Sequence, residues 1–153
     1  MHTVALSLTA DSSQGRSFTH VEMAAALRSC GIIDLVAEPG QGKSTILIQL
    51  GAELLRSGPV PVLVPLAEVG TGVDDLFSWP EGRQAFAGVR SAHLKFLAEH
   101  GELAFLLDGW NEVTPAGRIA LMKTLRALQR EFPLVVICIT TRSQAAAVPF
   151  VAR

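Results

Sequence analysis

The chain has 153 residues, of which 49% are hydrophobic and 18% are charged. This length suits a single domain, and the composition supplies enough apolar surface for a core and excludes an intrinsically disordered chain. Thirteen basic and 14 acidic residues leave a formal net charge of −1, so no overall attraction to nucleic acid or to an anionic membrane is indicated.

The first part of the chain leads to a glycine-rich segment. Residues 1–17 are polar and predict a flexible arm or linker ahead of one domain over residues 18–153. An alanine-rich helix is expected over Val21–Arg28 and a short strand over Ile32–Val36. The glycine-rich run Glu38–Gly42 follows this strand directly.

The middle of the chain alternates helix and strand. Apolar residues at helical spacing predict a helix over Lys43–Ser57, and Val60–Pro65 is predicted to be a strand. Prolines near both ends of that strand favour a place at or near the edge of a sheet. A polar turn region comes next, and a helix is predicted over Gly82–Glu99. Its apolar side is expected to carry Phe86, Val89, His93, Phe96 and Leu97.

The last elements complete an α/β pattern. The apolar run Leu103–Leu107 predicts a strand covered on both faces. Thr114 is expected to cap the next helix, with Pro115 in its first turn, and Leu134–Thr140 is predicted to be a further strand. Strands that alternate with helices indicate a mostly parallel sheet with right-handed connections. The buried stripe of the last helix is expected to be Leu121, Met122, Leu125, Leu128 and Phe132.

The segment around Lys43 has the residue types of a phosphate-binding loop. Gly42-Lys43-Ser44 fits the end of the pattern G-x-x-x-x-G-K-[ST], although Ala37 stands in place of the first glycine. Backbone N–H groups there could enclose a phosphate at the start of the following helix, with Lys43 on the outer phosphates and Ser44 on Mg²⁺. The alternative, a glycine turn before a helix, is disfavoured by the strand and helix predicted on either side. The predicted nucleotide-binding residues are Gly40, Gln41, Gly42, Lys43, Ser44 and Thr45.

Acidic residues follow the buried strand. Asp108 comes directly after Leu103–Leu107, and the carboxyl ends of parallel strands share one edge of the sheet, so Asp108 is predicted to serve Mg²⁺ beside the phosphate loop. Gly109 would leave room for the metal, and Glu112 is close enough to orient or deprotonate an attacking water. The alternative is a surface turn with a solvated glutamate. Arg142, after the last strand, could detect a terminal phosphate, although the residues alone favour an ordinary surface arginine.

Together, Gly31–Arg142 resembles the nucleotide-binding core of NACHT-type STAND ATPases, which are signalling NTPases of innate-immune and bacterial defence proteins. The most specific match is FLLDGWNEV, because an Asp-Gly followed by an acidic cluster after an apolar strand is similar to the extended acidic motif of NACHT proteins. The matching segments are AEPGQGKST (Ala37–Thr45), VPVLVPLAEV (Val60–Val69), FLLDGWNEV (Phe105–Val113) and ITTRS (Ile139–Ser143).

The resemblance implies a three-layer P-loop NTPase fold, incomplete at the C-terminal end, with ATP and Mg²⁺ as cofactors. It implies that Lys43 and Ser44 hold the phosphates and Mg²⁺, that Asp108 serves the metal, that Glu112 supports hydrolysis and that Arg142 senses the γ-phosphate. The strand before the phosphate loop and the strand before Arg142 should then be neighbours. ATP rather than GTP rests on the resemblance, since the chain has no N/T-K-x-D motif.

Members of this family continue with another strand, a helical bundle and a winged-helix domain, so further domains or protein partners absent from this chain are expected. Asn111 stands where the family usually has an aspartate, and this predicts slow hydrolysis. The expected function is an ATP/ADP switch with weak ATPase activity. The alternatives are a non-hydrolysing remnant that serves as an interaction module, and a small-molecule P-loop kinase, which the few cations of Val69–Gly101 disfavour.

The chain carries no sign of secretion or of membrane insertion. Cys30 and Cys138 do not form a CxxC pair, and the histidines show no metal-ligand spacing, which fits a reducing compartment. No apolar run approaches the length of about 20 residues that spans a bilayer. A cytoplasmic location is therefore expected.

Overall fold

The computed structural model describes residues 5–9, 32–36, 43–69 and 72–141, and it describes side chains from residue 47 onward, except that of Ser57. The predicted helix Val21–Arg28, the glycine-rich run that contains Gly40, Gln41 and Gly42, and Arg142 lie outside the described residues.

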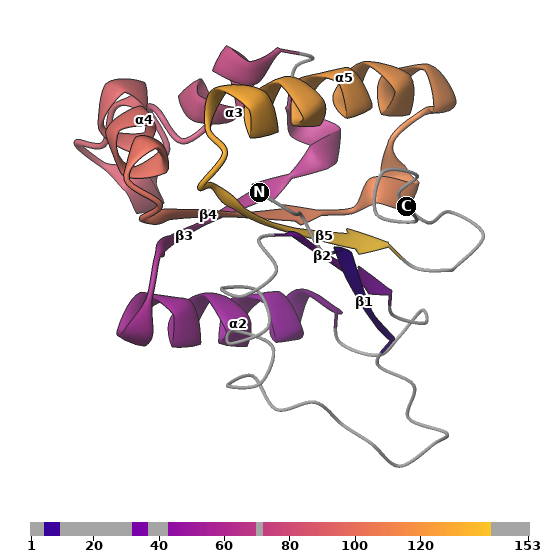
Figure 1. Cartoon of the computed structure of the whole chain (residues 1–153), viewed down its shortest axis with the longest axis horizontal. Helices are drawn as coiled ribbons and strands as arrows, with labels where there is room; N and C mark the ends of the chain where they lie inside the picture. Colours follow the sequence, from indigo (N-terminus) through magenta and orange to yellow (C-terminus); the bar gives the residue numbers. More distant parts are fainter. Residues whose placement is uncertain (1–4, 10–31, 37–42, 70–71, 142–153) are drawn as a thin grey trace.

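Five parallel strands form one sheet in the order β1-β2-β5-β4-β3 (Figure 1). The strands are β1 (Ala5–Thr9), β2 (Ile32–Val36), β3 (Val60–Pro65), β4 (Leu103–Asp108) and β5 (Val136–Thr141). The predicted strands over residues 32–36 and 60–65 are confirmed with the same bounds. The neighbours β2 and β5 are the two strands that the resemblance requires to be adjacent.

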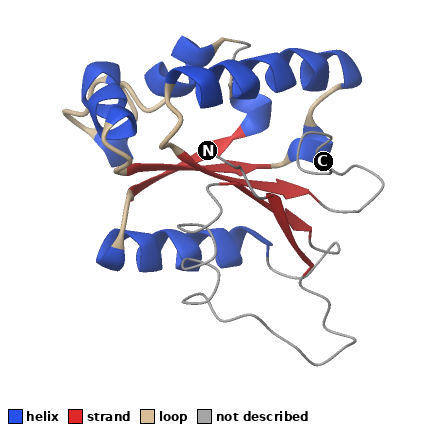
Figure 2. Ribbon diagram, viewed as in Figure 1, coloured by secondary structure: helices blue, strands red, loops and turns tan. Residues whose placement is uncertain are grey.

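Helices cover both faces of this sheet. The helix α2 (Lys43–Ser57) lies on one face, and α3 (Val73–Ser78), α4 (Ser91–Glu99) and α5 (Pro115–Glu131) lie on the other (Figure 2). This arrangement confirms the α/β class and the parallel sheet. Within the described residues, no helix is long and apolar enough to cross a membrane.

The main core lies between the sheet and the three helices on one face. It takes alternate residues of β3, β4 and β5, as strands with helices on both faces of the sheet require. The largest of these side chains, Phe105, packs edge-on against Phe77 with ring centroids 5.4 Å apart. The strand residues of this core are Val62, Val64, Leu103, Phe105, Leu107, Ile137 and Ile139.

The opposite face of the sheet receives α2 at close range. A Cβ atom added at Gly51 would lie 3.4 Å from Cδ1 of Leu106 and 3.7 Å from Cβ of Pro61. Since side chains alternate along β4, Asp108 lies on the same face as Leu106, and therefore on the face that α2 covers. The side chain of Asp108 therefore points to the face of the sheet that carries α2.

The strand β3 forms one edge of the sheet, as its prolines predict. The backbone N–H of Val60 donates to the carbonyl of Glu102 on the β4 side, at 2.7 Å. N–H groups alternate in direction along a strand, so Pro61 and Pro65 occupy positions whose N–H would point away from the sheet. Two of the donors that could pair with another chain are therefore missing, which protects the edge against aggregation.

The helix predicted over residues 82–99 is wrong in its first half. Only Ser91–Glu99 is α-helical, and a short 3₁₀ turn, η3 (Gln84–Phe86), precedes it. Gly88 has φ of +82°, which interrupts the helical path, and Arg90 is extended as the N-cap. The buried face also differs from the prediction.

Phe86, Val89 and Leu97 pack partly buried against the core, as predicted. The fully buried residues of α4 are instead Leu94 and Ala98, and the side chain of Phe96 is 57% exposed. The preceding segment, read from the sequence as a polar turn, contains the helix α3. Its two buried residues, Leu76 and Phe77, stand among aspartates and glycines, and a helix of six residues has too few turns to show a period.

Two segment boundaries also need correction. Residues 1–17 were expected to form a flexible arm, but Ala5–Thr9 pairs in parallel with β2 as a fifth strand. The last strand was expected over Leu134–Thr140. Leu134 instead belongs to the turn after α5 with its side chain half exposed, and the strand runs to Thr141.

Candidate functional site

The carboxyl ends of the four strands after β1 lie level with one another. Val36 at the end of β2 pairs with Thr141 of β5, and Pro65 at the end of β3 pairs with Asp108 of β4. The chain leaves β2 toward one face through α2 and leaves β4 toward the other face through α5, with β5 between them (Figure 1). In open α/β sheets, ligands bind at a reversal of this kind, outside the carboxyl ends of the strands.

The first turn of α2 belongs to this edge. The last turn of α2 is followed by Gly58-Pro59 and the start of β3, so the helix runs antiparallel to the strands over about 22 Å. Its first residues, Lys43, Ser44 and Thr45, therefore lie toward the carboxyl edge. A helix begins with backbone N–H groups that have no partner within the helix, which favours an anion there.

Asp108 ends β4 with its side chain half-buried and held by a neighbouring strand. The hydroxyl of Thr140 donates to Oδ1 of Asp108 at 2.6 Å. The same hydroxyl accepts the backbone N–H of Gly109 at 3.0 Å. Thr140 is fully buried, so these two hydrogen bonds satisfy polar groups that water does not reach and fix the orientation of the carboxylate.

The chain turns sharply after Asp108. Gly109 has φ of +91°, a left-handed conformation that favours glycine, and the 3₁₀ turn η4 (Trp110–Glu112) follows. The exposed Glu112 folds back over this glycine, because a Cβ atom added at Gly109 would lie 2.9 Å from Oε2 of Glu112. The two predicted acidic residues, Asp108 and Glu112, are thus brought to one turn.

Thr141, the next residue of β5, differs from Thr140 in its hydrogen bonding. Its side chain is fully buried, and its hydroxyl has no hydrogen-bond partner among the described residues. Alternation along β5 directs it to the face of α5, away from Asp108.

The carboxylate at this edge could serve as one ligand of a Mg²⁺ ion. Within the described part of the chain, no three or more His, Cys, Asp or Glu side chains gather to hold a metal ion. Mg²⁺ needs no such cage, because one or two carboxylates together with phosphate oxygens and water complete its shell. Asp108, oriented by Thr140, provides a carboxylate of this kind.

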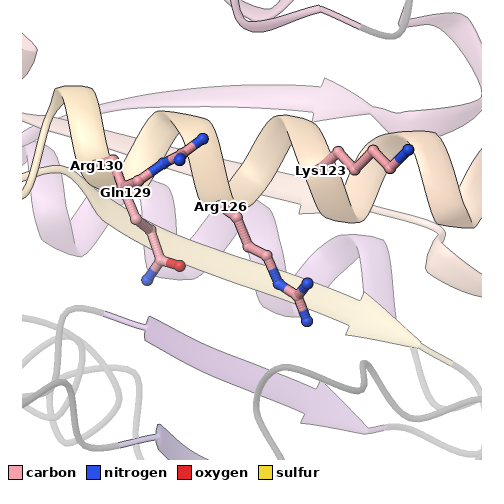
Figure 3. Close-up of a pocket in the computed structure, with 4 residues that line it drawn as sticks. All are labelled: Lys123, Arg126, Gln129 and Arg130. Carbon is pink, nitrogen blue, oxygen red and sulfur yellow. The ribbon is translucent and has the colours of Figure 1, made fainter.

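A separate hollow of about 610 Å³ lies along α5, lined by Lys123, Arg126, Gln129 and Arg130 (Figure 3). These residues occupy the second half of α5, and that helix runs from the carboxyl edge back to the start of β5. The hollow is therefore remote from Asp108. Its lining includes three basic side chains, and neither Asp108 nor Glu112 is among the lining residues.

The structure describes part of the predicted site. Asp108 and Glu112 lie together, and the backbone of Lys43, Ser44 and Thr45 begins α2. Gly40, Gln41, Gly42 and Arg142 lie outside the described residues. Thr140 was not assigned to the site from the sequence. The available signal was a threonine near the end of a buried strand. Only the strand order shows that this strand, β5, is the neighbour of β4, which carries Asp108.

Comparison of the chain with models of protein families, with curated protein sequences and with solved structures found no match.

Proposed function

We propose that this chain binds Mg²⁺-ATP at the carboxyl edge of its sheet and hydrolyses it slowly, as the nucleotide switch of a larger NACHT-type signalling or defence NTPase. One observation carries the proposal: Thr140 fixes Asp108 on the face where α2 begins, and Glu112 folds over Gly109 beside it. A phosphate-loop sequence therefore begins a helix on the face of the sheet that holds an oriented carboxylate.

Each predicted residue has a role in this proposal. The N–H groups around Gly40, Gln41 and Gly42 would enclose the phosphates, and Lys43 would neutralise the outer ones. Thr45 would serve the inner phosphates. The roles of these residues rest on the sequence and on the fold in which α2 follows β2.

Ser44 and Asp108 would hold Mg²⁺, which would neutralise charge on the phosphate oxygens. Glu112 orients and deprotonates the attacking water from its position over Gly109. The resemblance assigns to Arg142 the sensing of the terminal phosphate. The P-loop form of the α/β fold, with ATP rather than GTP as ligand, is part of the same proposal.

A titration of a fluorescent ATP analogue with Mg²⁺ tests the binding step. Lys43→Ala should weaken binding at least tenfold, because it removes the only side-chain cation that the motif aims at the phosphates. Lys123→Ala is the matched control, since it removes an exposed lysine of α5. Equal binding by the wild type and Lys43→Ala would contradict the proposal.

A non-hydrolysing switch is the second candidate, and Asn111 favours it, because an amide cannot act as a base where the resembled family has a carboxylate. A phosphate-release assay separates the two, with Glu112→Gln as the comparison. Release that falls at least tenfold in Glu112→Gln supports hydrolysis. Release equal to that of Glu112→Gln, together with intact ATP binding, identifies a binding module without turnover.

A further inference from the structure

We infer that Arg118 is a positioning residue of the proposed hydrolytic site, which holds the turn that carries Glu112 by binding two of its backbone carbonyls. This inference rests on the proposed function and assigns the arginine a part in turnover rather than in nucleotide binding. It concerns the first turns of α5, to which neither the motifs nor the strand ends assign a role.

The contacts of Arg118 are specific. Its Nε donates to the carbonyl of Trp110 at 3.2 Å, and one Nη donates to the carbonyl of Asn111 at 3.0 Å. Both acceptors belong to η4. The guanidinium is planar with several fixed donors, so it can hold two successive carbonyls at once, which a lysine cannot do with the same geometry.

The turn η4 needs such support. It consists of three residues, and a 3₁₀ turn of that length has little stability of its own. Its internal hydrogen bonds are those from the N–H of Glu112 to Gly109 and from the N–H of Val113 to Trp110, at 3.0 and 3.3 Å. Trp110 anchors one end in the core, where it is 1% exposed.

A glycine in the first turn of α5 leaves room for the side chains that follow the acidic turn. A Cβ atom added at Gly117 would lie 2.8 Å from Cγ1 of Val113 and 3.1 Å from the hydroxyl of Thr114, so a larger residue there would displace these side chains. Arg118, the next residue, is half-buried against the same turn. The guanidinium of Arg118 therefore contacts η4, the turn that carries Glu112.

The consequence concerns geometry at the reacting atoms. A general base must lie within hydrogen-bond reach of the attacking water, and a displacement of about 1 Å can cost about 100-fold in rate. Loss of the Arg118 contacts lets η4 move, whereas the hydrogen bond from Thr140 to Asp108 does not involve Arg118. Turnover should therefore fall while nucleotide affinity is kept.

The test compares Arg118→Met with wild type, with Arg118→Lys as the conservative variant and Arg126→Met as the control on the exposed side of α5. We expect Arg118→Met to lower kcat by about 10- to 100-fold while its Kd for Mg²⁺-ATP stays within about twofold. Arg118→Lys should restore part of kcat, and Arg126→Met should leave both quantities unchanged. Should Arg118→Met fail to fold, Arg118→Lys against Arg126→Met provides the same comparison.

Hydrogen exchange at the amides of Glu112 and Val113 gives a second readout, with the amides of β4 as internal reference. Faster exchange in Arg118→Met that is confined to the turn supports the inference. An unchanged kcat in this variant overturns it. An equal loss of binding and turnover, with faster exchange throughout the sheet, also overturns it.

The wild type separates this inference from the proposed function. If the wild type binds Mg²⁺-ATP but releases no phosphate, the role of Arg118 is wrong and nucleotide binding stands. If the wild type binds no Mg²⁺-ATP, the proposed function itself fails.

Discussion

The hydroxyl of Thr140 joins Asp108 to its neighbouring strand, because it donates to the carboxylate at 2.6 Å and accepts the N–H of Gly109 at 3.0 Å. The two side chains are 32 positions apart in the sequence. Their contact follows from the pairing of β4 with β5, which puts the ends of both strands at one edge. The orientation of the acidic residue thus depends on a residue outside its own motif.

Two adjacent threonines of β5 should respond oppositely to removal of the hydroxyl. Thr140→Val leaves the N–H of Gly109 buried without its acceptor, and we expect a loss of about 1–3 kcal/mol in the free energy of unfolding. Thr141→Val removes a buried hydroxyl that has no partner among the described residues, so it should be neutral or stabilising. Urea unfolding of both variants measures the difference. Equal destabilisation by the two substitutions would show that the hydrogen bonds of Thr140 add nothing to the free energy of unfolding.

Gly109 should be required for the shape of the acidic turn. Gly109→Ala combines a positive φ with a contact of 2.9 Å to the Glu112 carboxylate, so we expect a loss of about 1–3 kcal/mol in stability and a displaced Glu112. Gly88→Ala is the matched control, because Gly88 has φ of +82° and a Cβ atom there meets no atom within 4 Å.

Both glycine variants should therefore be less stable in urea unfolding, but only Gly109→Ala should also slow phosphate release. A Gly109→Ala protein that unfolds like the Gly88→Ala protein and turns over like the wild type would contradict this account of the turn.

A carboxylate outside the site should make stability depend on pH. The backbone N–H of Ser91, the first residue of α4, donates to Oε1 of Glu81 at 2.7 Å, and this hydrogen bond is the main cause that holds the pKa of Glu81 below its ordinary value. A lowered pKa in the folded state means that the unfolded state binds the proton more readily. The contribution is therefore fully present above the ordinary pKa of a glutamate and is lost as the pH falls through the lowered value.

Glu81→Gln should consequently lower the melting temperature near neutral pH by a small amount, and the difference from the wild type should shrink as the pH falls below the ordinary pKa of a glutamate. Thermal unfolding across this range measures it. Glu68→Gln, at an exposed glutamate of the 3₁₀ turn η2 (Leu66–Glu68), is the control. A difference in melting temperature that grows on acidification would mean that the hydrogen bond with Ser91 raises the pKa of Glu81 instead of lowering it.

The sequence predicts the central fold well because the patterns there are local. Helical spacing over Lys43–Ser57 and a continuous apolar run at Leu103–Leu107 each fit one element type, and the cap at Thr114 forms, since its hydroxyl accepts the N–H of Gly117 at 3.1 Å. The segment 70–90 was predicted poorly. Its two helical pieces are short, and Gly82, with a positive φ, lies between them.

The candidate site was predictable only as far as its motifs extend. Asp108 and Glu112 are recognisable because they follow a buried strand. Thr140, Arg118 and Gly117 act on them through strand pairing and helix packing, which involve residues distant in sequence or outside any motif. A side chain whose role depends on which strands are neighbours cannot be assigned before the order β2-β5-β4 is known.

The most direct test of the central claim is the Mg²⁺ dependence of ATP-analogue binding by the wild type and Asp108→Asn. The amide keeps the size of the side chain and still accepts a hydrogen bond from Thr140, so the variant isolates the negative charge. We predict that Mg²⁺ tightens binding to the wild type at least tenfold and has little effect on Asp108→Asn. The same Mg²⁺ effect in both proteins would contradict a metal-nucleotide site at this edge of the sheet.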